Sequence, residues 1–371
     1  MKILFLSAAK SIHTVKWVNA FAERGHEVYL ISIKGHEPKE NTLHSNIKFY
    51  QLRYGGTLGY YMNAHEFSKL VKKIKPDVIN VHYASGYGTL ARISNISHYI
   101  LSIWGSDVYD FPYESTLKNY ILKKNVKNAD LIASTSECMA NQLRRVMKNE
   151  KLEIAITPFG VDLNLFDPSK YPKDDNDDFV VGTVKALESK YGIYELILAF
   201  DKLKKHLEEK DNWKKNLKLI IYGDGTQKVF LEKIIKEKKL EKNVLLKGRI
   251  PNSEVPKAIS KFDLFVVLSQ LDSESFGVAA VEAMAMEKPV IASDVDGFKE
   301  VIKDEITGVI VPRKGIDIAE ETMYKFTIDS ELRNRIGVNG RIHVEKKYSW
   351  TKNVDNMLEI YNKMNEVKVN G

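Results

Sequence analysis

Residues 269–297 read SQLDSESFGVAAVEAMAMEKPVIASDVDG, and the order of elements within them predicts the architecture. The stretch follows an apolar run at 264–268 that predicts a buried strand, and it begins with a short acidic loop. Gly277 then precedes small and apolar residues at 278–286, which predict a helix. Pro289 leads into another apolar run at 290–292. A strand, a loop, a helix and a second strand in this order predict a βαβ unit with parallel strands.

The same alternation runs through the rest of the chain. In the first half, strands are predicted at 2–7, 27–33, 47–52, 77–82, 100–103, 131–134 and 154–157. In the second half, they are predicted at 179–184, 218–222, 244–247, 264–268 and 290–292. Helical patterns separate most of these strands, which indicates parallel sheets. The predicted fold class is therefore α/β, with two Rossmann-like domains that face each other across a cleft. Ligands bind beyond the carboxyl ends of the strands in such folds.

The domain boundaries follow from composition. Pro168, Pro172 and the acidic run at 174–178 predict a linker over residues 168–178. The linker separates a first domain of residues 1–167 from a second domain of residues 179–350. Residues 351–371 form an amphipathic C-terminal helix that can pack back on the first domain.

Composition narrows the class of protein. The chain has 371 residues, more than one hydrophobic core usually serves, and 44% of them are hydrophobic. Its one cysteine, Cys138, cannot form an internal disulfide, which favours a cytoplasmic location. No run approaches the roughly 18 apolar residues that would span a bilayer. We therefore expect a cytoplasmic protein that is soluble or peripheral at the inner face of the membrane.

The positive charge is unevenly placed. The whole excess behind the net charge of +7 falls in residues 1–170. Solvated helix faces explain such an excess, and so does an anionic membrane surface, an acidic acceptor or a nucleic acid. Residues 118–127, KNYILKKNVK, mix lysines with apolar side chains at helical spacing. They fit a helix lying against anionic lipid, and they fit equally a basic surface helix packed on its own sheet.

The helix predicted after Gly277 suits an anionic ligand. A helix N-terminus presents unpaired N–H groups and the positive end of its dipole, which favours a diphosphate. Glu274 precedes this helix and Glu282 lies on its second turn. Carboxylates accept hydrogen bonds from paired hydroxyls, which a sugar and a ribose both offer. The pattern therefore predicts a site for a nucleotide sugar.

The segment from Glu274 to Met284, ESFGVAAVEAM, resembles the signature of glycosyltransferase family 4, the group 1 glycosyl transferases. This resemblance implies the GT-B architecture and a reaction that retains anomeric configuration. It implies that Glu274 orients the donor sugar and Glu282 the ribose. Phe276, Gly277 and Val278 would lie along the donor.

Further donor contacts are implied by the same resemblance. Lys185 and Lys190 stand at the spacing of the family's phosphate-binding Arg and Lys, with lysine in the arginine's place. Gly223 begins a glycine turn after a strand, and Arg249 and Ile250 lie in the segment that faces the nucleobase. Where the family typically has paired glycines, only Gly297 is kept, after Asp296.

The first domain is expected to bind the acceptor. His13, His82 and Trp104 follow predicted strands at their carboxyl ends. The family commonly has a histidine before Gly-Ser-Asp, where this chain has Trp104. His82 and Asp107 are the candidates to replace that catalytic-side hydrogen-bonding group, while His13 and Trp104 are assigned to the acceptor side.

We therefore expect a retaining hexosyltransferase that moves a hexose or N-acetylhexosamine from a nucleoside-diphosphate sugar. UDP is the expected nucleotide, and the expected acceptor is a glycan or a polyprenyl-linked sugar of cell-surface polysaccharide synthesis. No nucleic-acid partner is expected. The alternatives are a nucleotide-sugar epimerase or hydrolase of the same fold, and a non-catalytic nucleotide-sugar-binding partner. A nicotinamide dehydrogenase is disfavoured because no G-x-G-x-x-G follows the first strand.

No metal cofactor is expected. Asp294-Val-Asp296 resembles the D-x-D metal motif of a different glycosyltransferase fold. In this chain, Lys185, Lys190 and the helix dipole would already neutralise the phosphates.

Overall fold

The computed structural model of the chain describes residues 1–172, 178–210, 213 and 215–370. The described chain divides into two compact units. The first consists of Met1–Phe159 together with the C-terminal segment from Thr351, and the second is Gly160–Trp350. Residues 173–177, which include most of the acidic run of the predicted linker, lie outside the described residues. The flanking residues form a 3-10 turn, Pro168–Lys170, and the first residue of strand β8.

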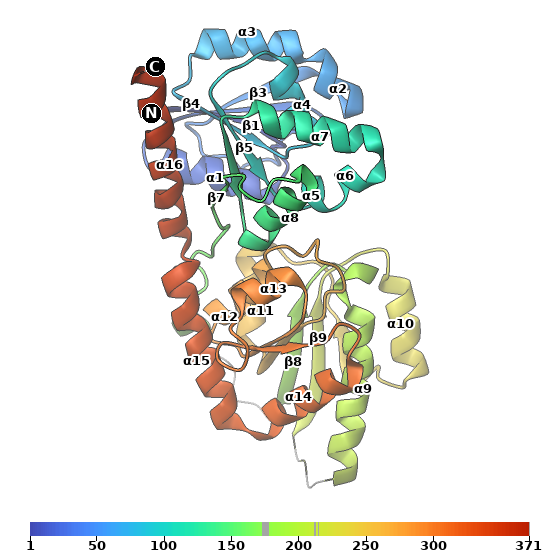
Figure 1. Cartoon of the computed structure of the whole chain (residues 1–371). Helices are drawn as coiled ribbons and strands as arrows, with labels where there is room; N and C mark the ends of the chain where they lie inside the picture. Colours follow the sequence, from blue (N-terminus) through green and yellow to red (C-terminus); the bar gives the residue numbers. More distant parts are fainter. Residues whose placement is uncertain (173–177, 211–212, 214, 371) are drawn as a thin grey trace. The chain divides into compact units, whose positions relative to one another are not determined.

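The first unit contains a seven-stranded parallel sheet in the order β3-β2-β1-β4-β5-β6-β7. Its strands are β1 (Lys2–Leu6), β2 (Glu27–Lys34), β3 (Lys48–Gly55), β4 (Val78–His82), β5 (Tyr99–Ile103), β6 (Leu131–Ser134) and β7 (Ala155–Ile156). Its helices are α1 (Ile12–Glu23), α2 (Gly56–Met62), α3 (Ala64–Ile74), α4 (Gly86–Ile93), α5 (Ser106–Tyr109), α6 (Phe111–Glu114), α7 (Thr116–Asn128) and α8 (Glu137–Met147). Helices cover both faces of the sheet (Figure 1). The central strands are continuous apolar runs because both of their faces are buried.

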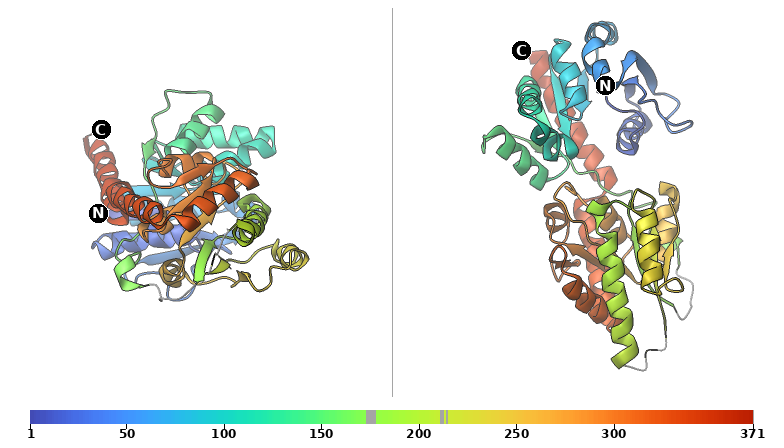
Figure 2. Two further views of the ribbon diagram at one scale, coloured as in Figure 1. Left: turned by 90° about the horizontal axis from the view of Figure 1, so that it is seen from below. Right: turned by 90° about the vertical axis from the view of Figure 1, so that its right-hand side faces the viewer.

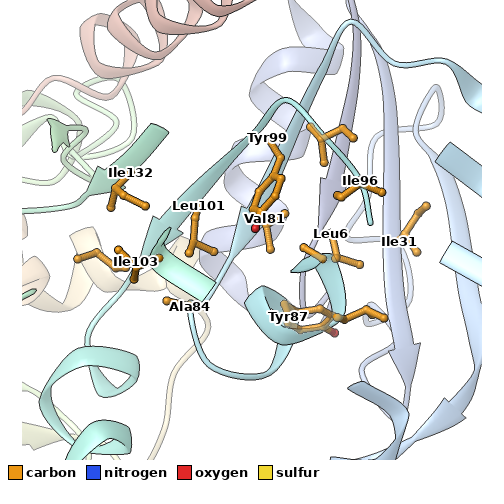
Figure 3. Packing of buried hydrophobic residues seen from close by; sticks show 14 of the residues in the cluster. Leu6, Ile31, Val81, Ala84, Tyr87, Ile96, Tyr99, Leu101, Ile103 and Ile132 are labelled. Atoms are coloured by element: carbon orange, nitrogen blue, oxygen red, sulfur yellow. The ribbon is translucent and has the colours of Figure 1, made fainter. Parts of the chain in front are cut away.

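The core of the first unit forms where these strands meet the helices. Figure 3 shows Leu6, Ile31, Val81 and Leu101 from neighbouring strands, with Tyr87 of α4 packed near them. All of these side chains are almost completely buried. This core fixes the strand ends, and therefore the loops that follow them.

The C-terminal helix α16 (Trp350–Asn370) belongs to the first unit from Thr351 onward. Asn80 on β4 donates a hydrogen bond to the Tyr361 hydroxyl at 2.6 Å, and the Tyr361 ring lies 5.2 Å from that of Phe21. Arg24 forms an ion pair with Asp355 at 3.2 Å. The helix therefore packs on the first unit through a buried tyrosine, although it follows the second unit in sequence.

The second unit contains a six-stranded parallel sheet in the order β10-β9-β8-β11-β12-β13. Its strands are β8 (Asp178–Val184), β9 (Asn216–Tyr222), β10 (Val244–Leu246), β11 (Leu264–Val267), β12 (Val290–Ser293) and β13 (Val309–Val311). Its helices are α9 (Ile193–Lys210), α10 (Lys228–Glu237), α11 (Val255–Ser260), α12 (Val278–Ala285), α13 (Asp296–Val301), α14 (Ile316–Ile328) and α15 (Ser330–Lys347). Figure 2 shows the long helix α9 along this sheet.

The predicted α/β fold class with two Rossmann-like sheets is confirmed. All seven strands predicted for the first half are present, as are the five predicted for the second, with ends shifted by a few residues. The edge strand β13 was not predicted, and neither were the short helices α2, α4, α5, α6 and α13.

Candidate functional site

Each sheet reverses its strand order at one point. In the second unit, β8 pairs with β9 on one side and with β11 on the other, so the chain moves outward in opposite directions from β8 and β11. In the first unit, β1 and β4 stand in the same relation. The loops that leave the carboxyl ends of two such strands diverge and open a crevice, which is where ligands bind in open α/β sheets. Most of the predicted site residues lie at or after the carboxyl ends of these four strands or of β5, the neighbour of β4, whereas Gly223 follows β9, and Arg249 and Ile250 follow β10.

Lys185 and Lys190 both lie in the loop that leaves β8. The Lys185 N–H donates to the Tyr222 carbonyl at 2.9 Å, which extends the pairing of β8 with β9 by one residue. Lys190 lies in a 3-10 turn, Ser189–Tyr191, and its carbonyl accepts a hydrogen bond from the Gln270 N–H at 2.8 Å. The loop after β8 is therefore tied to the loop after β11.

Two glycines make this loop packing possible. Gly192 has a φ of +66°, and a Cβ there would lie 1.8 Å from the Leu268 carbonyl oxygen. Gly223 has a φ of +153°, and a Cβ there would lie 1.9 Å from the Lys185 carbonyl oxygen. Both contacts are to backbone, so neither position accepts a side chain without moving the loop that carries the lysines. The predicted glycine turn at Gly223 thus has a packing role beside Lys185.

Glu274, in the loop after β11, forms an ion pair with Lys185. The Lys185 side chain is 13% exposed and the Glu274 side chain 11%, so the pair is largely removed from water. Ser269 donates a hydrogen bond to the same carboxylate oxygen of Glu274 at 3.4 Å. The two residues that the sequence assigned to the donor phosphates and the donor sugar are therefore in direct contact.

Tyr191 is a neighbour of both lysines that the sequence interpretation missed. The Lys185 ammonium lies 4.5 Å and the Lys190 ammonium 5.1 Å from the centroid of its ring. An aromatic face attracts cations at this range. Two ammonium groups are thus held at one ring, and one of them, that of Lys185, is also paired with the Glu274 carboxylate. The only signal in the sequence was the position of a tyrosine directly after Lys190.

The loop after β11 ends at the N-terminus of α12. Gly277 precedes the helix with a φ of +75°, and a Cβ there would lie 2.6 Å from the Phe298 ring. Val278 is the first residue of α12, so the first N–H groups of the helix point toward this loop. Phe276 is buried and packs edge to face against Tyr348, with ring centroids 5.5 Å apart. The helix start is therefore fixed by packing on both of its sides.

Glu282 lies on the second turn of α12 and is buried. Gly297, the glycine that this chain keeps, packs against the other predicted glutamate. A Cβ at Gly297 would lie 2.1 Å from the Glu274 carbonyl oxygen and 2.7 Å from the Phe276 backbone nitrogen. The glycine thus supports the backbone of the acidic loop, a contact that requires the absence of a side chain.

The aspartates that resemble a metal motif are paired with cations. Asp294 accepts hydrogen bonds from the Arg313 backbone N–H at 2.9 Å and from its Nε at 3.2 Å. Asp296 forms an ion pair with Lys299 at 2.8 Å. Arg313 also pairs with Asp272 at 3.1 Å. Within the described part of the chain, no group of three or more His, Cys, Asp and Glu side chains is placed to hold a metal ion.

Arg249 and Ile250 follow β10, at the carboxyl end of the sheet. Arg249 is exposed and Ile250 is partly exposed. The preceding Gly248 accepts a hydrogen bond from the Gly223 N–H at 2.9 Å, which connects this segment to the turn beside Lys185. Contact of Arg249 and Ile250 with a nucleobase stays a prediction.

In the first unit, an aromatic cluster lies at the carboxyl ends of the central strands. The Trp104 ring centroid is 4.0 Å from that of His82 and 6.0 Å from that of His13. His13 stacks on Phe159 at 4.0 Å. Trp104 and His13 are partly exposed, whereas His82 is almost completely buried behind Trp104.

The two histidines of the cluster are held in their neutral form. Burial, followed by the charge of His13, lowers the pKa of His82 to about 3. Burial, followed by the charge of Lys16, lowers the pKa of His13 to about 4. His82 Nδ1 lies 3.0 Å from the Ser7 hydroxyl, which in turn lies 2.7 Å from that of Thr14. His82 therefore joins a buried hydrogen-bond chain that orders the loop after β1.

Asp107, like His82, has a structural role in the first unit. Its carboxylate accepts hydrogen bonds from the backbone N–H groups of Ala84 at 2.9 Å, Gly105 at 2.9 Å and Trp104 at 3.1 Å. Burial raises the pKa of Asp107 above its ordinary value, and these backbone donors oppose the rise. The geometry shows Asp107 holding the loop that carries Trp104, and His82 holding the loop after β1. Their catalytic roles stay predictions.

Comparisons with known proteins agree with this arrangement. The family model described as glycosyl transferases group 1 matches residues 167–343, and the model described as glycosyl transferase 4-like matches residues 2–136. No helix in the described ranges is both long and apolar enough to cross a bilayer.

Individual relatives cover most of the chain. The N-acetyl-alpha-D-glucosaminyl L-malate synthase of Bacillus anthracis is 24% identical over 367 residues, which cover 92% of this chain and 90% of the relative. The UDP-Gal:alpha-D-GlcNAc-diphosphoundecaprenol alpha-1,3-galactosyltransferase of Escherichia coli is 25% identical over 311 residues, covering 79% and 77%. The solved structure of the Anabaena protein HepE in complex with UDP-glucose is similar with a TM-score of 0.77 and 16% identity, covering 98% of this chain and all of that one.

The two family models together match most of the chain, and the site residues lie at the switch points of two parallel sheets. The chain therefore belongs to the group 1 glycosyltransferases and has their GT-B fold.

Proposed function

We propose that this glycosyltransferase moves a hexose or N-acetylhexosamine from a UDP-sugar, with retention, to a glycan or polyprenyl-linked acceptor in cell-surface polysaccharide synthesis. The observation that carries the proposal is the convergence of Lys185, Lys190 and Glu274 at the switch point of the second sheet. Two ammonium groups at one ring, one of them paired with a carboxylate, suit a ligand whose anionic and hydroxyl-bearing parts adjoin, as pyrophosphate and sugar do in a nucleotide sugar.

Each of these groups has a distinct part in donor binding. Lys185 and Lys190 bind the pyrophosphate, together with the N–H groups at the start of α12. Glu274 exchanges part of its contact with Lys185 for the sugar hydroxyls, and Glu282 accepts hydrogen bonds from the ribose. Because lysine offers a point charge rather than a bidentate fork, Lys185 neutralises the phosphate without fixing its orientation. The loop glycines and Tyr191 must therefore supply the orientation.

The transfer step is a front-face displacement. The bond between the donor C1 and the pyrophosphate oxygen breaks, and the acceptor hydroxyl attacks C1 from the same face. The departing UDP takes the acceptor proton on its terminal phosphate, so no covalent intermediate on the enzyme is formed. The protein contributes positioning and electrostatic stabilisation of the charge that grows on the leaving pyrophosphate.

The names of the relatives support the finer assignments. The E. coli relative is named for UDP-Gal as donor, for a diphosphoundecaprenol-linked sugar as acceptor and for an α-linked product. The Bacillus relative is named for an N-acetylglucosaminyl product, also α-linked. The HepE structure contains UDP-glucose. These names favour a UDP-hexose or UDP-N-acetylhexosamine donor and an acceptor carried on a lipid.

We propose that transfer needs no divalent cation and takes place in the cytoplasm. Lysine ammonium groups stand where a cation would otherwise neutralise the pyrophosphate, and the candidate ligands Asp294 and Asp296 are paired with Arg313 and Lys299. The single cysteine fits a reducing compartment. Transfer should therefore persist in excess EDTA, and a loss that Mn²⁺ or Mg²⁺ restores would contradict the metal assignment.

The donor assignment is tested with purified protein. Nucleotide sugars are first screened for thermal stabilisation, and the best donor is then incubated with candidate acceptors and analysed by mass spectrometry. Lys190→Met should raise the donor KM or abolish transfer, whereas Lys242→Met, at an exposed lysine outside the site, should change neither.

Two controls separate the alternatives. The donor incubated alone should stay intact, because conversion to an isomer or to free sugar would indicate an epimerase or a hydrolase. Wild-type kinetics for Lys190→Met would refute the phosphate assignment. NMR of the product then reports whether the anomeric configuration is retained.

A further inference from the structure

The outer face of α7 is unusual for a surface helix because it carries large apolar side chains. Leu117 and Tyr120, one turn apart, are 65% and 59% exposed. Tyr113 of the preceding helix α6 is 64% exposed. The buried residues of α7, which include Leu122 and Val126, lie on the opposite side and hold the helix on its sheet. The exposed apolar residues are therefore not part of the core of this unit.

The same face is cationic. The sequence of α7, TLKNYILKKNVKN, contains four lysines and no acidic residue. Lys124 and Lys127 are exposed and continue the line of Leu117 and Tyr120 along the helix at spacings of three and four residues. The Lys124 ammonium lies 5.4 Å from the centroid of the Tyr120 ring. Positive charge and apolar surface are thus combined on one stripe.

A second exposed apolar group lies in the same layer of helices. Helix α2, GTLGYYM, has no charged residue, and its Leu58, Tyr61 and Met62 are exposed. It packs on α4, partly through an edge contact between Tyr60 and Tyr87 at 5.2 Å, and α4 packs on α7. Figure 1 shows α2, α4 and α7 along one side of the first unit. Among the side chains of this unit that the structure describes, six of the seven large exposed apolar residues lie on α2, α6 or α7.

We propose that this surface, formed by the exposed residues of α2, α6 and α7, docks the first unit on an anionic lipid membrane. Leucine, methionine and tyrosine side chains enter the boundary between headgroups and acyl chains, and the lysines of α7 lie at the level of the anionic headgroups. The inference does not depend on which sugar is transferred, since binding to vesicles needs no donor.

Charge distinguishes this surface from a similar helix elsewhere. On α10, Val229 and Phe230 are also exposed, but its lysines alternate with acidic residues, and Lys233 pairs with Glu237 at 3.6 Å. Helix α7 has four lysines and no acidic residue, and although Glu114 of α6 pairs with Lys118, α6 and α7 together keep a net charge of +3 that attracts an anionic surface. Lysines are depleted from contacts between subunits, whereas lysines beside exposed apolar and aromatic side chains are typical of helices that lie at a membrane surface.

The test is flotation of the full chain with lipid vesicles. The protein should float with vesicles that contain phosphatidylglycerol and stay behind with vesicles of phosphatidylcholine alone. Lys124→Gln combined with Lys127→Gln should lower the partition coefficient about 25-fold, since each lysine near an anionic surface is worth about fivefold. Leu117→Ser combined with Tyr120→Ser should lower it by about tenfold or more. Salt raised from about 0.1 M to about 0.5 M should release the wild type.

A matched variant controls for loss of folding and for nonspecific binding. Val229→Ser combined with Lys236→Gln changes one apolar residue and one lysine on α10, and it should float like the wild type. Melting temperatures should agree among all variants within a few degrees. Absence of flotation, or an equal loss in the α10 variant, would overturn the proposal. So would a dimer, detected by sedimentation, that Leu117→Ser with Tyr120→Ser dissociates, because a second copy would then cover the surface.

Discussion

The buried ion pair between Lys185 and Glu274 should show strong energetic coupling. Lys185→Met would leave the Glu274 carboxylate 11% exposed, with the distant Ser269 hydroxyl in place of an ammonium group. Breaking a fully buried pair lowers the free energy of unfolding by about 3–5 kcal/mol. Because both side chains keep some contact with water, we expect each single substitution to lower it by about 2–3 kcal/mol. Lys185→Met combined with Glu274→Met leaves no buried charge and should cost no more than about 2 kcal/mol. The coupling free energy should therefore be at least about 2 kcal/mol.

Calorimetry of the four proteins in this double-mutant cycle measures the coupling. A change of 1 kcal/mol shifts the melting temperature of a unit the size of Gly160–Trp350 by roughly 2–4 °C. Each single variant should therefore melt roughly 4–12 °C lower in that transition. The lowering in the double variant should be smaller than the sum of the two single lowerings. The exposed pair Lys204–Glu208 is the matched control, with a coupling below about 0.5 kcal/mol. Additive losses at Lys185 and Glu274 would refute the reasoning.

Three other perturbations probe the remaining parts of the two units. Gly297→Ala should raise the donor KM about tenfold or more, because its Cβ would displace the Glu274 backbone. The control Gly88→Ala should leave the donor KM unchanged, because the nearest atom to a Cβ there is 3.3 Å away. Equal kinetics for the two variants would contradict the packing role of Gly297. Burial keeps the pKa of His82 at about 3, below its ordinary value of about 6.5, so the unfolded chain binds more protons between these values. The stabilising contribution of neutral His82 is therefore complete above pH 6.5 and is lost as the pH falls toward 3. Melting temperatures against pH should show a steeper acid loss in the wild type than in His82→Phe, and equal slopes would contradict this. Trp104→Ala should raise the acceptor KM more than the donor KM in steady-state kinetics. Trp104→Phe should raise the acceptor KM less, because it keeps most of the stacking surface. A change confined to the donor KM would contradict the assignment of Trp104 to the acceptor side.

Most of the fold could be predicted because its strands are continuous apolar runs. Such runs are typical of parallel strands buried on both faces, and β4 and β5 are buried along their whole length. Strand β13 was not predicted because its three residues, between Gly308 and Pro312, are too few to show a periodic pattern. Helix α2 escaped because GTLGYYM contains two glycines and no polar face. In both cases tertiary packing decides the structure.

The sequence indicated candidate residues for the site, but it did not predict the contacts that these residues make. The resemblance to the family's motifs indicated Lys185, Lys190 and Glu274, and the structure brings Lys185 and Glu274 into an ion pair that the motifs do not predict. The pair forms because β8 and β11 are neighbours in the sheet, although about eighty residues separate them in sequence. Asp107 illustrates the opposite case. Its carboxylate accepts hydrogen bonds from three neighbouring loop amides, and residue type alone does not distinguish such a carboxylate from a catalytic one.

The central claim is that a pyrophosphate binds at the switch point of the second sheet. A crystal structure of the protein with UDP tests this claim most directly. We expect pyrophosphate oxygens within about 3 Å of the Lys185 and Lys190 ammonium groups and of the first N–H groups of α12, with the ribose at Glu282. A pyrophosphate bound away from both lysines, or a ribose on the far side of α12 from Glu282, would contradict the account.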